Sequence, residues 1–525
     1  MTDLWLGKFW PVMGQGAVEL EISLTGAPEA VAALKDSRLI CGLTTAAGRW
    51  RHIHERHFDT REGRLAAAGI SLRLRGEGAA AIQSARRTLA PLSIPKPLER
   101  PVGVSGFPAP TGDPDMDAAI ASTLFDLRVI AETRVDRWSA ALRYGQSSFD
   151  LSIDLGRAAP PSGLKTDRGA EPIAEAEIAF VAGDKPDLFE LARLIVDNSA
   201  LRLGAPMKTV TAANASRNLD RFAVGKFKKP PINPEAPAAD ALQSMIAAAA
   251  DRVIRCQDLI LQLRSPTGPH QMRVALRRFR SVERVFRPAL QTNKVYALTR
   301  RARSIAQALG PARDMDVFLF ETMPDVFGRE NEPHGAGALR AEAERMRAQA
   351  WADAHKAVAQ QAFVHFTIDL AEAGVLAPWR AHLHPQARAP LWAFAPFALN
   401  RALKKAYKAE RLMDRTQLAA RHPLRIALKK HRYAAQLFGK LYDPERRRPY
   451  MTALSRLQDA LGIVNDAVVA QEVADAAGAG AGPDAMRAAG FISGYKAAEA
   501  EAAADEIDRA WTEFLETPAF WRHDG

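Results

Sequence analysis

One pattern occurs twice in this chain, as HQMRVALRRFRSVERVF at residues 270–286 and as HPLRIALKKHRYAAQLF at residues 422–438. Six positions are identical between the two stretches, and Met/Leu, Val/Ile and Arg/Lys exchanges preserve the character of others. The same offset of 152 positions places LGPARDMDV (309–317) on LGIVNDAVV (461–469) without a gap. One shared offset over about fifty residues indicates an internal duplication. We therefore predict two related helical bundles that face each other across a pseudo-two-fold axis.

Each copy of the pattern carries a stripe of basic residues at helical spacing, along one face of the expected helix. The first stripe consists of His270, Arg273, Arg277, Arg280 and Arg284. The second consists of His422, Arg425, Lys429 and Arg432, with Lys430 beside it. Neighbouring like charges on a helix repel each other, and a multivalent anion lying along them removes that cost. Arginine suits such an anion because its planar guanidinium binds phosphate oxygens in pairs.

The net charge of the chain supports an anionic partner for this half. Residues 1–220 hold 26 Lys and Arg against 27 Asp and Glu, whereas residues 221–525 hold 45 against 33, a net charge of +12. Nucleic acid, acidic lipid and polyphosphate all fit a basic surface. Nucleic acid would require stacking aromatic residues among the basic ones, and only Phe279 and Tyr433 are near, with Phe279 on the apolar face. The sequence therefore disfavours nucleic acid.

The first half has the alternating pattern of strands, as in Val18–Ile22, Ile70–Arg75 and Phe149–Asp154. FKKPPINPEAP (227–237) is rich in Pro and Lys and separates this half from the helical one. We therefore expect an α+β multidomain protein, with a strand domain at 17–215, a linker at 222–238 and an all-α, internally duplicated helical-bundle domain at 239–520.

Charged residues of the strand half occur in pairs that share a strand face. Glu19 and Glu21, Glu175 and Glu177, and Asp150 and Asp154 are acidic pairs, and Arg73 and Arg75 are a basic pair. A closed barrel with a charged interior would collect them, and it would suit a phosphate chain held by arginines with a divalent metal on the carboxylates. An ordinary amphipathic sheet with solvated charges remains the alternative from these pairs alone.

The helical half resembles the CHAD family, the conserved-histidine α-helical domain. The resemblance covers about 285 residues and rests on the two basic helices, on LGPARDMDVF (309–318) and on LQDALGIVND (457–466). It implies a basic central channel that binds inorganic polyphosphate. The residues that it assigns to binding are His270, Arg273, Arg277, Arg280, Arg303, Arg313, His422, Arg425, Lys429, Lys430 and Arg432.

The strand half resembles the CYTH family, the triphosphate tunnel enzymes. The resemblance rests on Glu19-x-Glu21, FDT (58–60), LRLR (72–75), QSAR (83–86), Asp154-x-Gly156 and EPIAEAE (171–177). It implies an antiparallel eight-stranded β tunnel that uses Mg²⁺ or Mn²⁺ to act on a triphosphate-containing small molecule. The implied catalytic residues are Glu19, Glu21, Arg73, Arg75, Arg86, Arg137, Asp154, Glu175 and Glu177, and the implied metal ligands are Glu19, Glu21, Glu175 and Glu177.

Three positions depart from the CYTH pattern. Ser23 and Arg86 stand where the family has lysines, and Ala179 replaces an acid on a late strand. Arg86 keeps a positive charge but Ser23 does not, and one lost charge contact of this kind commonly costs about 10²–10³ in rate. We predict a polyphosphate-binding protein with a metal-dependent inorganic triphosphatase-like domain. The alternative is a polyphosphate-binding or localising protein with weak catalysis or none.

The remaining features bear on location. Cys41 and Cys256 lie far apart and fit no disulfide framework, so we expect a reducing compartment. No apolar run reaches the ~20 residues that span a bilayer, and residues 1–16 lack the pattern of a signal peptide. These features predict a cytoplasmic protein with no membrane partner, and polyphosphate granules are a place where we would expect it.

Overall fold

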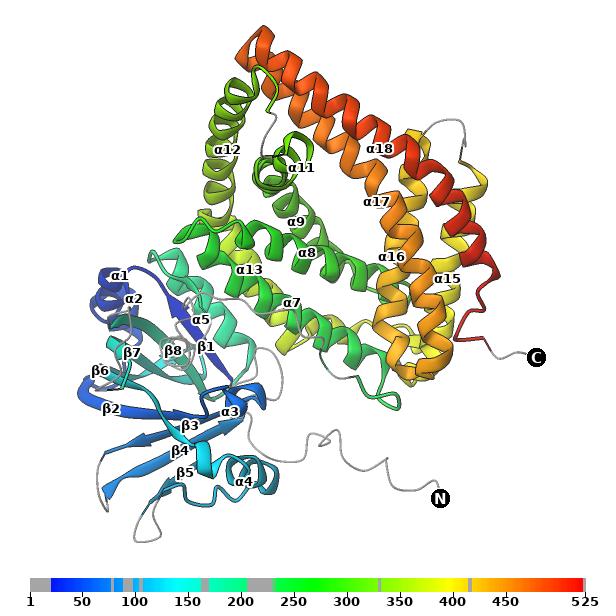
Figure 1. The fold of residues 1–525 in the computed structure, drawn as a ribbon. Coiled ribbons are helices and arrows are strands. Elements are labelled where there is room, and N and C mark those ends of the chain that lie inside the picture. Colours follow the sequence, from blue (N-terminus) through cyan, green and yellow to red (C-terminus); the bar gives the residue numbers. More distant parts are fainter. Residues whose placement is uncertain are drawn as a thin grey trace. The chain divides into compact units, whose positions relative to one another are not determined.

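A computed structural model shows a β-rich N-terminal region followed by helices (Figure 1). The structure describes residues 20–76, 80–87, 98–102, 107–161, 170–204, 230, 232–328, 332–413 and 418–522. The chain divides into two compact units. The first consists of residues 1–230, 246–258 and 361–378, and the second of residues 231–245, 259–360 and 379–525. The first unit thus includes two helical segments of the helical half, one near its start and one from its middle.

The first unit contains one sheet, which has nine strands within the described residues. They are β1 (Glu21–Thr25), β2 (Arg49–Asp59), β3 (Ile70–Arg75), β4 (Ile82–Arg87), β5 (Leu98–Pro101), β6 (Arg128–Tyr144), β7 (Ser147–Ala159), β8 (Glu171–Ala182) and β9 (Arg202–Leu203). The order across the sheet is β5-β4-β3-β2-β6-β7-β8-β1-β9, and neighbouring strands pair antiparallel. The predicted antiparallel sheet is confirmed. Its strand number is nine rather than the expected eight, because the two-residue β9 pairs with β1.

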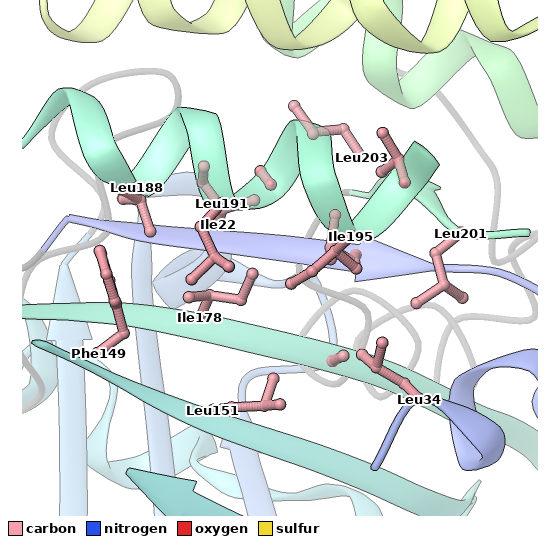
Figure 2. Packing of buried hydrophobic residues seen from close by; sticks show 14 of the residues in the cluster. Ile22, Leu34, Phe149, Leu151, Ile178, Leu188, Leu191, Ile195, Leu201 and Leu203 are labelled. Carbon is pink, nitrogen blue, oxygen red and sulfur yellow. The ribbon is translucent and has the colours of Figure 1, made fainter. Parts of the chain in front are cut away.

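One face of this sheet is apolar and packs on helices. Ile22 of β1, Leu151 of β7 and Ile178 of β8 are buried together with Leu191 and Ile195 of α5 (Pro186–Asp197), as Figure 2 shows. Burying each of these side chains contributes about 1.5–3 kcal/mol. Because side chains alternate along a strand, the residues between them point to the other face of the sheet. The apolar core therefore fixes which face receives the charged residues.

Two segments of the helical half belong to this apolar core. Helix α13 (Gln361–Val375) packs on α5 and contributes Val364, Ile368 and Ala371 to the buried cluster. The Arg193 guanidinium on α5 pairs with the carboxylates of Asp369 and Glu372. Such a long-range association leaves no local pattern, so the sequence did not reveal it. The predicted limits 17–215 and 239–520 stay predictions, and most of the expected linker lies outside the described residues.

The second unit is helical, as predicted. Its principal helices are α8 (Thr267–Phe286), α9 (Lys294–Ala308), α10 (Gly310–Val317), α12 (Ala336–Ala359), α15 (Leu391–Arg411), α16 (His422–Phe438), α17 (Pro444–Ala481) and α18 (Pro483–Glu516). A π-helical turn, Phe318–Thr322, follows α10. The two repeated stretches form α8 and α16, whose apolar stripes are buried. No helix in the described part of the chain has the length and apolarity needed to cross a membrane.

Candidate functional site

The sheet face opposite the apolar core carries a cluster of carboxylates. Ser23 on β1 pairs with Glu177 on β8, and Asp154 on β7 pairs with Glu175 on β8. One oxygen each from Asp154, Glu175 and Glu177 lies within 4.8 Å of the others. Asp154 and Glu175 are fully buried. Carboxylate oxygens are the ligands that Mg²⁺ and Mn²⁺ prefer, so this trio fits a divalent cation.

The crowding of charge shows in the pKa of Glu177. Burial, followed by the negative charge of Glu21, raises this pKa to about 7 from an ordinary value of 4.5. The positive charges of Arg137, Arg86 and Arg73 act in the opposite direction. A bound cation would favour the ionised carboxylate and reverse the shift.

Arg137 on β6 directly contacts two carboxylates of the trio. Its Nε donates to Asp154 Oδ1 at 2.7 Å and its Nη2 to Asp154 Oδ2 at 2.8 Å. The same Nη2 lies 3.6 Å from Glu177 Oε2. Two parallel bonds of this kind are among the strongest that a carboxylate accepts. Arg137 therefore partly neutralises the cluster and offers a guanidinium beside it.

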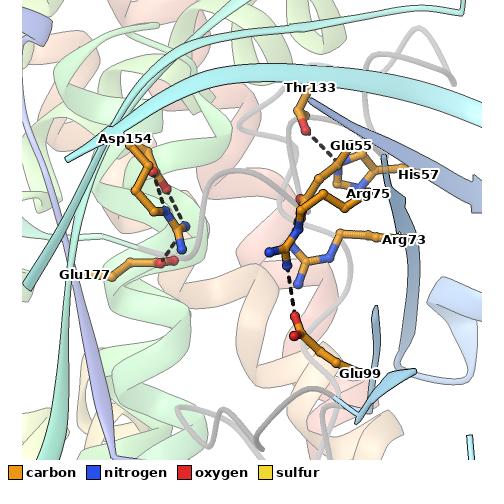
Figure 3. Close-up of polar contacts among 9 residues, drawn as sticks. Glu55, His57, Arg73, Arg75, Glu99, Thr133, Asp154 and Glu177 are labelled. Carbon is orange, nitrogen blue, oxygen red and sulfur yellow. Dashed lines mark hydrogen bonds and ion pairs between the residues drawn. The ribbon is translucent and has the colours of Figure 1, made fainter. Parts of the chain in front are cut away.

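A second charged group points into the same interior from β2 and β3 (Figure 3). Arg73 Nη1 donates to Glu55 Oε2 at 3.1 Å, and Arg75 Nε lies 3.4 Å from Glu55 Oε1. Arg75 also donates to Glu99 Oε1 at 2.9 Å. Beside this group His57 Nε2 and Thr133 Oγ1 lie 3.1 Å apart. This wall therefore presents guanidinium groups held in place by acids.

The two walls belong to one curled sheet. Strands lie about 4.8 Å apart, so β3 and β8, four strands apart in order, would be about 19 Å apart if the sheet were flat. The charges of Arg73 on β3 and Arg86 on β4 nevertheless act on Glu177 on β8. The sheet therefore curves so that its charged face encloses a common interior, as expected of a tunnel.

Polar atoms in this interior lack hydrogen-bond partners. Glu21 Oε1, Ser23 Oγ, Ser84 Oγ and Arg86 Nε are buried with no such partner among the described residues. Ser84 and Arg86 share a face of β4 and pair with Arg73 and Ser71 of β3. A buried polar group without a partner costs about 1–3 kcal/mol, so the interior fits a polar ligand that satisfies several of these atoms.

The structure brings most of the predicted tunnel residues together. Those that it collects around the interior are Glu21, Arg73, Arg75, Arg86, Arg137, Asp154, Glu175 and Glu177. Glu19 lies outside the described residues. Of the predicted metal ligands, Glu175 and Glu177 group with Asp154, while Glu21 acts on Glu177 through its charge. Glu55 and His57 were not predicted, although their alternation in RHIHERH (51–57) places them on one face of a strand.

In the second unit, the basic helices of both copies line one cavity of about 1240 Å³. Its lining includes six of the predicted binding residues, which are His270, Arg273, Arg277, Arg313, Arg425 and Lys429. It also includes Asp314 and Asp466, which are equivalent in the duplication, as are Arg273 and Arg425. Both halves of the repeat therefore contribute matching residues to a single channel.

The channel is not lined by cations alone. Six Lys and Arg and six Asp and Glu line it, and the acids come from α10, the π-helical turn, α11 (Met323–Phe327), α17 and α18 rather than from the basic helices. Arg313 donates to Glu321 at 3.0 Å and Arg425 lies 3.9 Å from Asp466. The sequence pattern of a single helix could not reveal these acidic partners, because they lie on other helices. Four of its six Lys and Arg residues, Arg277 and Lys429 among them, come from α8 and α16.

Cation crowding at that place shifts the pKa of the neighbouring groups. Burial, followed by the charges of Arg425 and Arg277, lowers the pKa of Lys429 to about 8. Burial and the charges of Arg313 and Arg277 also lower the pKa of His270. Each charged form is thus disfavoured in the protein alone, and an anion in the channel would stabilise it.

The other predicted basic residues lie outside this channel lining. Lys430 lines a separate small cavity. Burial and the charges of Arg284 and Arg303 lower the pKa of Arg280. Arg432 donates to Gln458 Oε1 at 3.1 Å, and His422 is exposed at the first turn of α16.

The helical half is thus a duplicated domain, and its basic helices enclose a charged channel. Residues 244–475 match the family model of the CHAD domain. No curated protein matches the chain.

Several solved structures are similar to parts of this chain. The CHAD domain of the plant Ricinus communis is 24% identical, covers 57% of this chain and 98% of its own, and gives a TM-score of 0.48. PptA from Streptomyces chartreusis is 20% identical, with 53% and 100% covered and a TM-score of 0.42. An adenylyl cyclase-type protein of Hippeastrum with a dominant triphosphatase activity is 16% identical, with 39% and 98% covered and a TM-score of 0.26. At these scores the likenesses carry no functional argument.

Proposed function

We propose that this protein binds inorganic polyphosphate in its helical domain and hydrolyses a triphosphate, such as tripolyphosphate, in its curled sheet. The observation that carries the proposal is that the Asp154–Glu175–Glu177 trio and several arginines face one interior. Carboxylates that hold a divalent cation and guanidiniums that hold phosphate oxygens are the two components that phosphoryl transfer requires.

The residues of the tunnel would divide this work between them. Asp154, Glu175 and Glu177 would hold Mg²⁺ or Mn²⁺, which when bound would supply charge neutralisation to the phosphate oxygens. Arg73 and Arg86 would orient the phosphate chain from the opposite wall. The buried Ser84 Oγ would donate a hydrogen bond to the same chain. The curved sheet keeps all these groups in a partly desolvated interior, where their charges act more strongly on the ligand than they would in water.

A weaker catalyst, or a binding protein without turnover, is the second candidate. Two observations favour it. Ser23 pairs with Glu177 where a lysine would place a positive charge, and Arg137 already donates two hydrogen bonds to Asp154. Arg137 thereby neutralises part of the trio and would compete with a cation for Asp154.

Polyphosphate binding is supported by the channel. Arg277 and Lys429 come from the two copies of the repeat and line the same cavity. The charge of Arg277 lowers the pKa of Lys429, which indicates that the two cations are close. A polyanion would relieve their repulsion. The volume of about 1240 Å³ leaves room for several phosphate groups.

The test is phosphate release from tripolyphosphate in the presence of Mg²⁺ or Mn²⁺. We expect Glu175→Gln to abolish release, because the trio would lose a negatively charged ligand. Glu190→Gln, which changes an exposed carboxylate on α5, is the matched control and should behave as the unchanged protein does. Equal activity in Glu175→Gln and the unchanged protein would refute the catalytic proposal.

A further inference from the structure

A second, smaller cavity lies along α8 beyond the residues that line the channel. It encloses about 60 Å³, and its basic lining residues are Arg284 of α8, Arg401 and Lys405 of α15 and Lys430 of α16. The rest of the lining is Ser281 and small or apolar side chains, with no Asp or Glu among the described residues that form it. Four cations therefore surround a space that is large enough for only one small ion.

This cavity is separate from the channel because the two lie on different sides of α16. Lys429 lines the channel and Lys430 lines the small cavity. Successive helical residues are about 100° apart around the axis, and Arg425 on the channel side and Ala427 on the other differ by about 200°. A ligand in the channel therefore does not fill the small cavity.

The small cavity is also absent from the second copy of the repeat. At the offset of 152, Arg284 corresponds to Gln436, Arg401 to Ala249 and Lys405 to Val253. Three of the four cations thus have no counterpart. The cluster is therefore not a by-product of the duplicated basic stripe, and it needs an explanation of its own.

Neighbouring acids do not neutralise this cluster. Glu283 is the acid whose charge acts on Arg401, and it accepts two hydrogen bonds from Arg287, at 2.6 and 2.8 Å. No acid in the described part of the chain pairs with Arg284, Lys405 or Lys430. Burial and the charges of Arg284 and Lys405 lower the pKa of Lys430 to about 8.

One of the four cations has a structural role that accounts for it. Arg401 Nη2 donates to the carbonyl oxygens of Arg284 and Val285, at 2.7 and 3.2 Å, near the end of α8. Cations at this end of a helix satisfy carbonyl groups that have no partner within the helix. The carbonyls explain Arg401 alone and leave the other three cations without a comparable role.

We propose that Arg284, Lys405 and Lys430 form a second oxyanion site that takes one phosphate group. Three positive charges suit a tetrahedral oxyanion, and a space of about 60 Å³ excludes a nucleoside. The phosphate group has two possible sources, free orthophosphate and a phosphoryl group of a polyphosphate chain. Only the second source rests on the proposed function.

The experiment uses the full chain and two titrations followed by calorimetry, one with inorganic phosphate and one with long-chain polyphosphate. The test variant is Lys405→Ala/Lys430→Ala. The matched control is Lys404→Ala/Lys408→Ala, which removes two exposed charges from the same part of the chain outside the cavity. Circular dichroism checks that both variants fold, and Lys405→Arg/Lys430→Arg tests whether restored charge rescues binding.

Loss of about 10-fold or more in affinity for orthophosphate, in the test variant alone, would assign the site to free phosphate. A loss confined to the polyphosphate titration would assign it to a chain phosphate. If the test variant and the matched control behave alike in both titrations, the site does not exist. Arg277→Ala probes the channel separately, so its effect on polyphosphate binding distinguishes failure of the small site from failure of the proposed function.

Discussion

Ser23 lies directly opposite Glu177 in the β1–β8 pairing. The hydroxyl oxygen is buried and has no hydrogen-bond partner among the described residues, while burial and the charge of Glu21 raise the pKa of its neighbour Glu177 to about 7. A lysine at this position would set an ammonium group beside that carboxylate. The serine therefore leaves this acidic side of the interior without the positive charge that a lysine at the same position would supply.

We accordingly predict that Ser23→Lys raises the rate of tripolyphosphate hydrolysis. The gain should be about 10²-fold, the usual effect of one charge contact with the transition state. Phosphate release at saturating Mn²⁺ measures it. Ser23→Met is the matched control, because it fills similar space without charge. A gain in both variants would mean that packing, and not charge, limits the reaction.

The raised pKa of Glu177 predicts that metal binding depends on pH. Its carboxyl is protonated below a pH of about 7 and must lose its proton to bind a cation. We expect the affinity for Mn²⁺ to fall by up to about 10-fold for each pH unit below 7, as measured by calorimetry between pH 5.5 and 8. In Glu177→Gln this pH dependence should disappear, and a profile that stays the same would show that another group titrates.

The same shift affects stability in the absence of metal. Because the pKa of Glu177 is higher in the folded protein than in the unfolded chain, the folded state binds more protons between a pH of about 4.5 and 7. The free energy of unfolding should therefore decrease as the pH rises through this range. Urea denaturation at pH 5 and pH 8 measures it, and added Mn²⁺ should remove the decrease. A free energy of unfolding that rises over this interval would contradict the assigned pKa.

The sequence predicted the helical half well because its information is local. The spacing of Arg273 and Arg277 defines a helix face, and the offset of 152 relates that face to Arg425 and Lys429. The structure places all four of these residues in the lining of one channel. The acids Glu321 and Asp466 were missed as partners because they reach the channel from other helices, through contacts that leave no periodic signal.

The sheet was predictable in type but less so in detail. Alternation along β7 and β8 placed Asp154 and Glu175 on a polar face, yet only the register of the strands shows that they are paired. Glu55 escaped notice because its role depends on Arg73, a partner 18 residues away. The small cavity of Arg284 and Lys405 joins two helices far apart in the sequence, so no motif marks it.

The lowered pKa values of Lys429 and Lys430 predict that polyphosphate binding depends on pH. Burial and neighbouring cations lower the pKa of both Lys429 and Lys430 to about 8, so each loses its charge as the pH rises above that value. We expect affinity for polyphosphate to fall by about 10-fold or more between pH 7 and pH 9.5, as measured by fluorescence anisotropy. Lys429→Arg should reduce the fall, because the guanidinium stays charged in this range. A variant with an unchanged profile would assign the pH effect to another group.

The last prediction concerns Arg277, which lines the channel at the place where the two repeat copies meet. Arg277→Ala removes a cation whose field lowers the pKa of Lys429, so it should weaken polyphosphate binding while raising that pKa. The loss in affinity should be about 10-fold or more, the usual effect of one charge-assisted contact. Arg300→Ala is the matched control, since Arg300 is exposed on α9 and does not line the channel.

The polyphosphate titration is then repeated with double-stranded DNA as competitor. If DNA displaces polyphosphate at equal phosphate concentration, the basic helices serve a nucleic acid and the proposed ligand is wrong. If it does not, the loss in Arg277→Ala assigns polyphosphate to this channel.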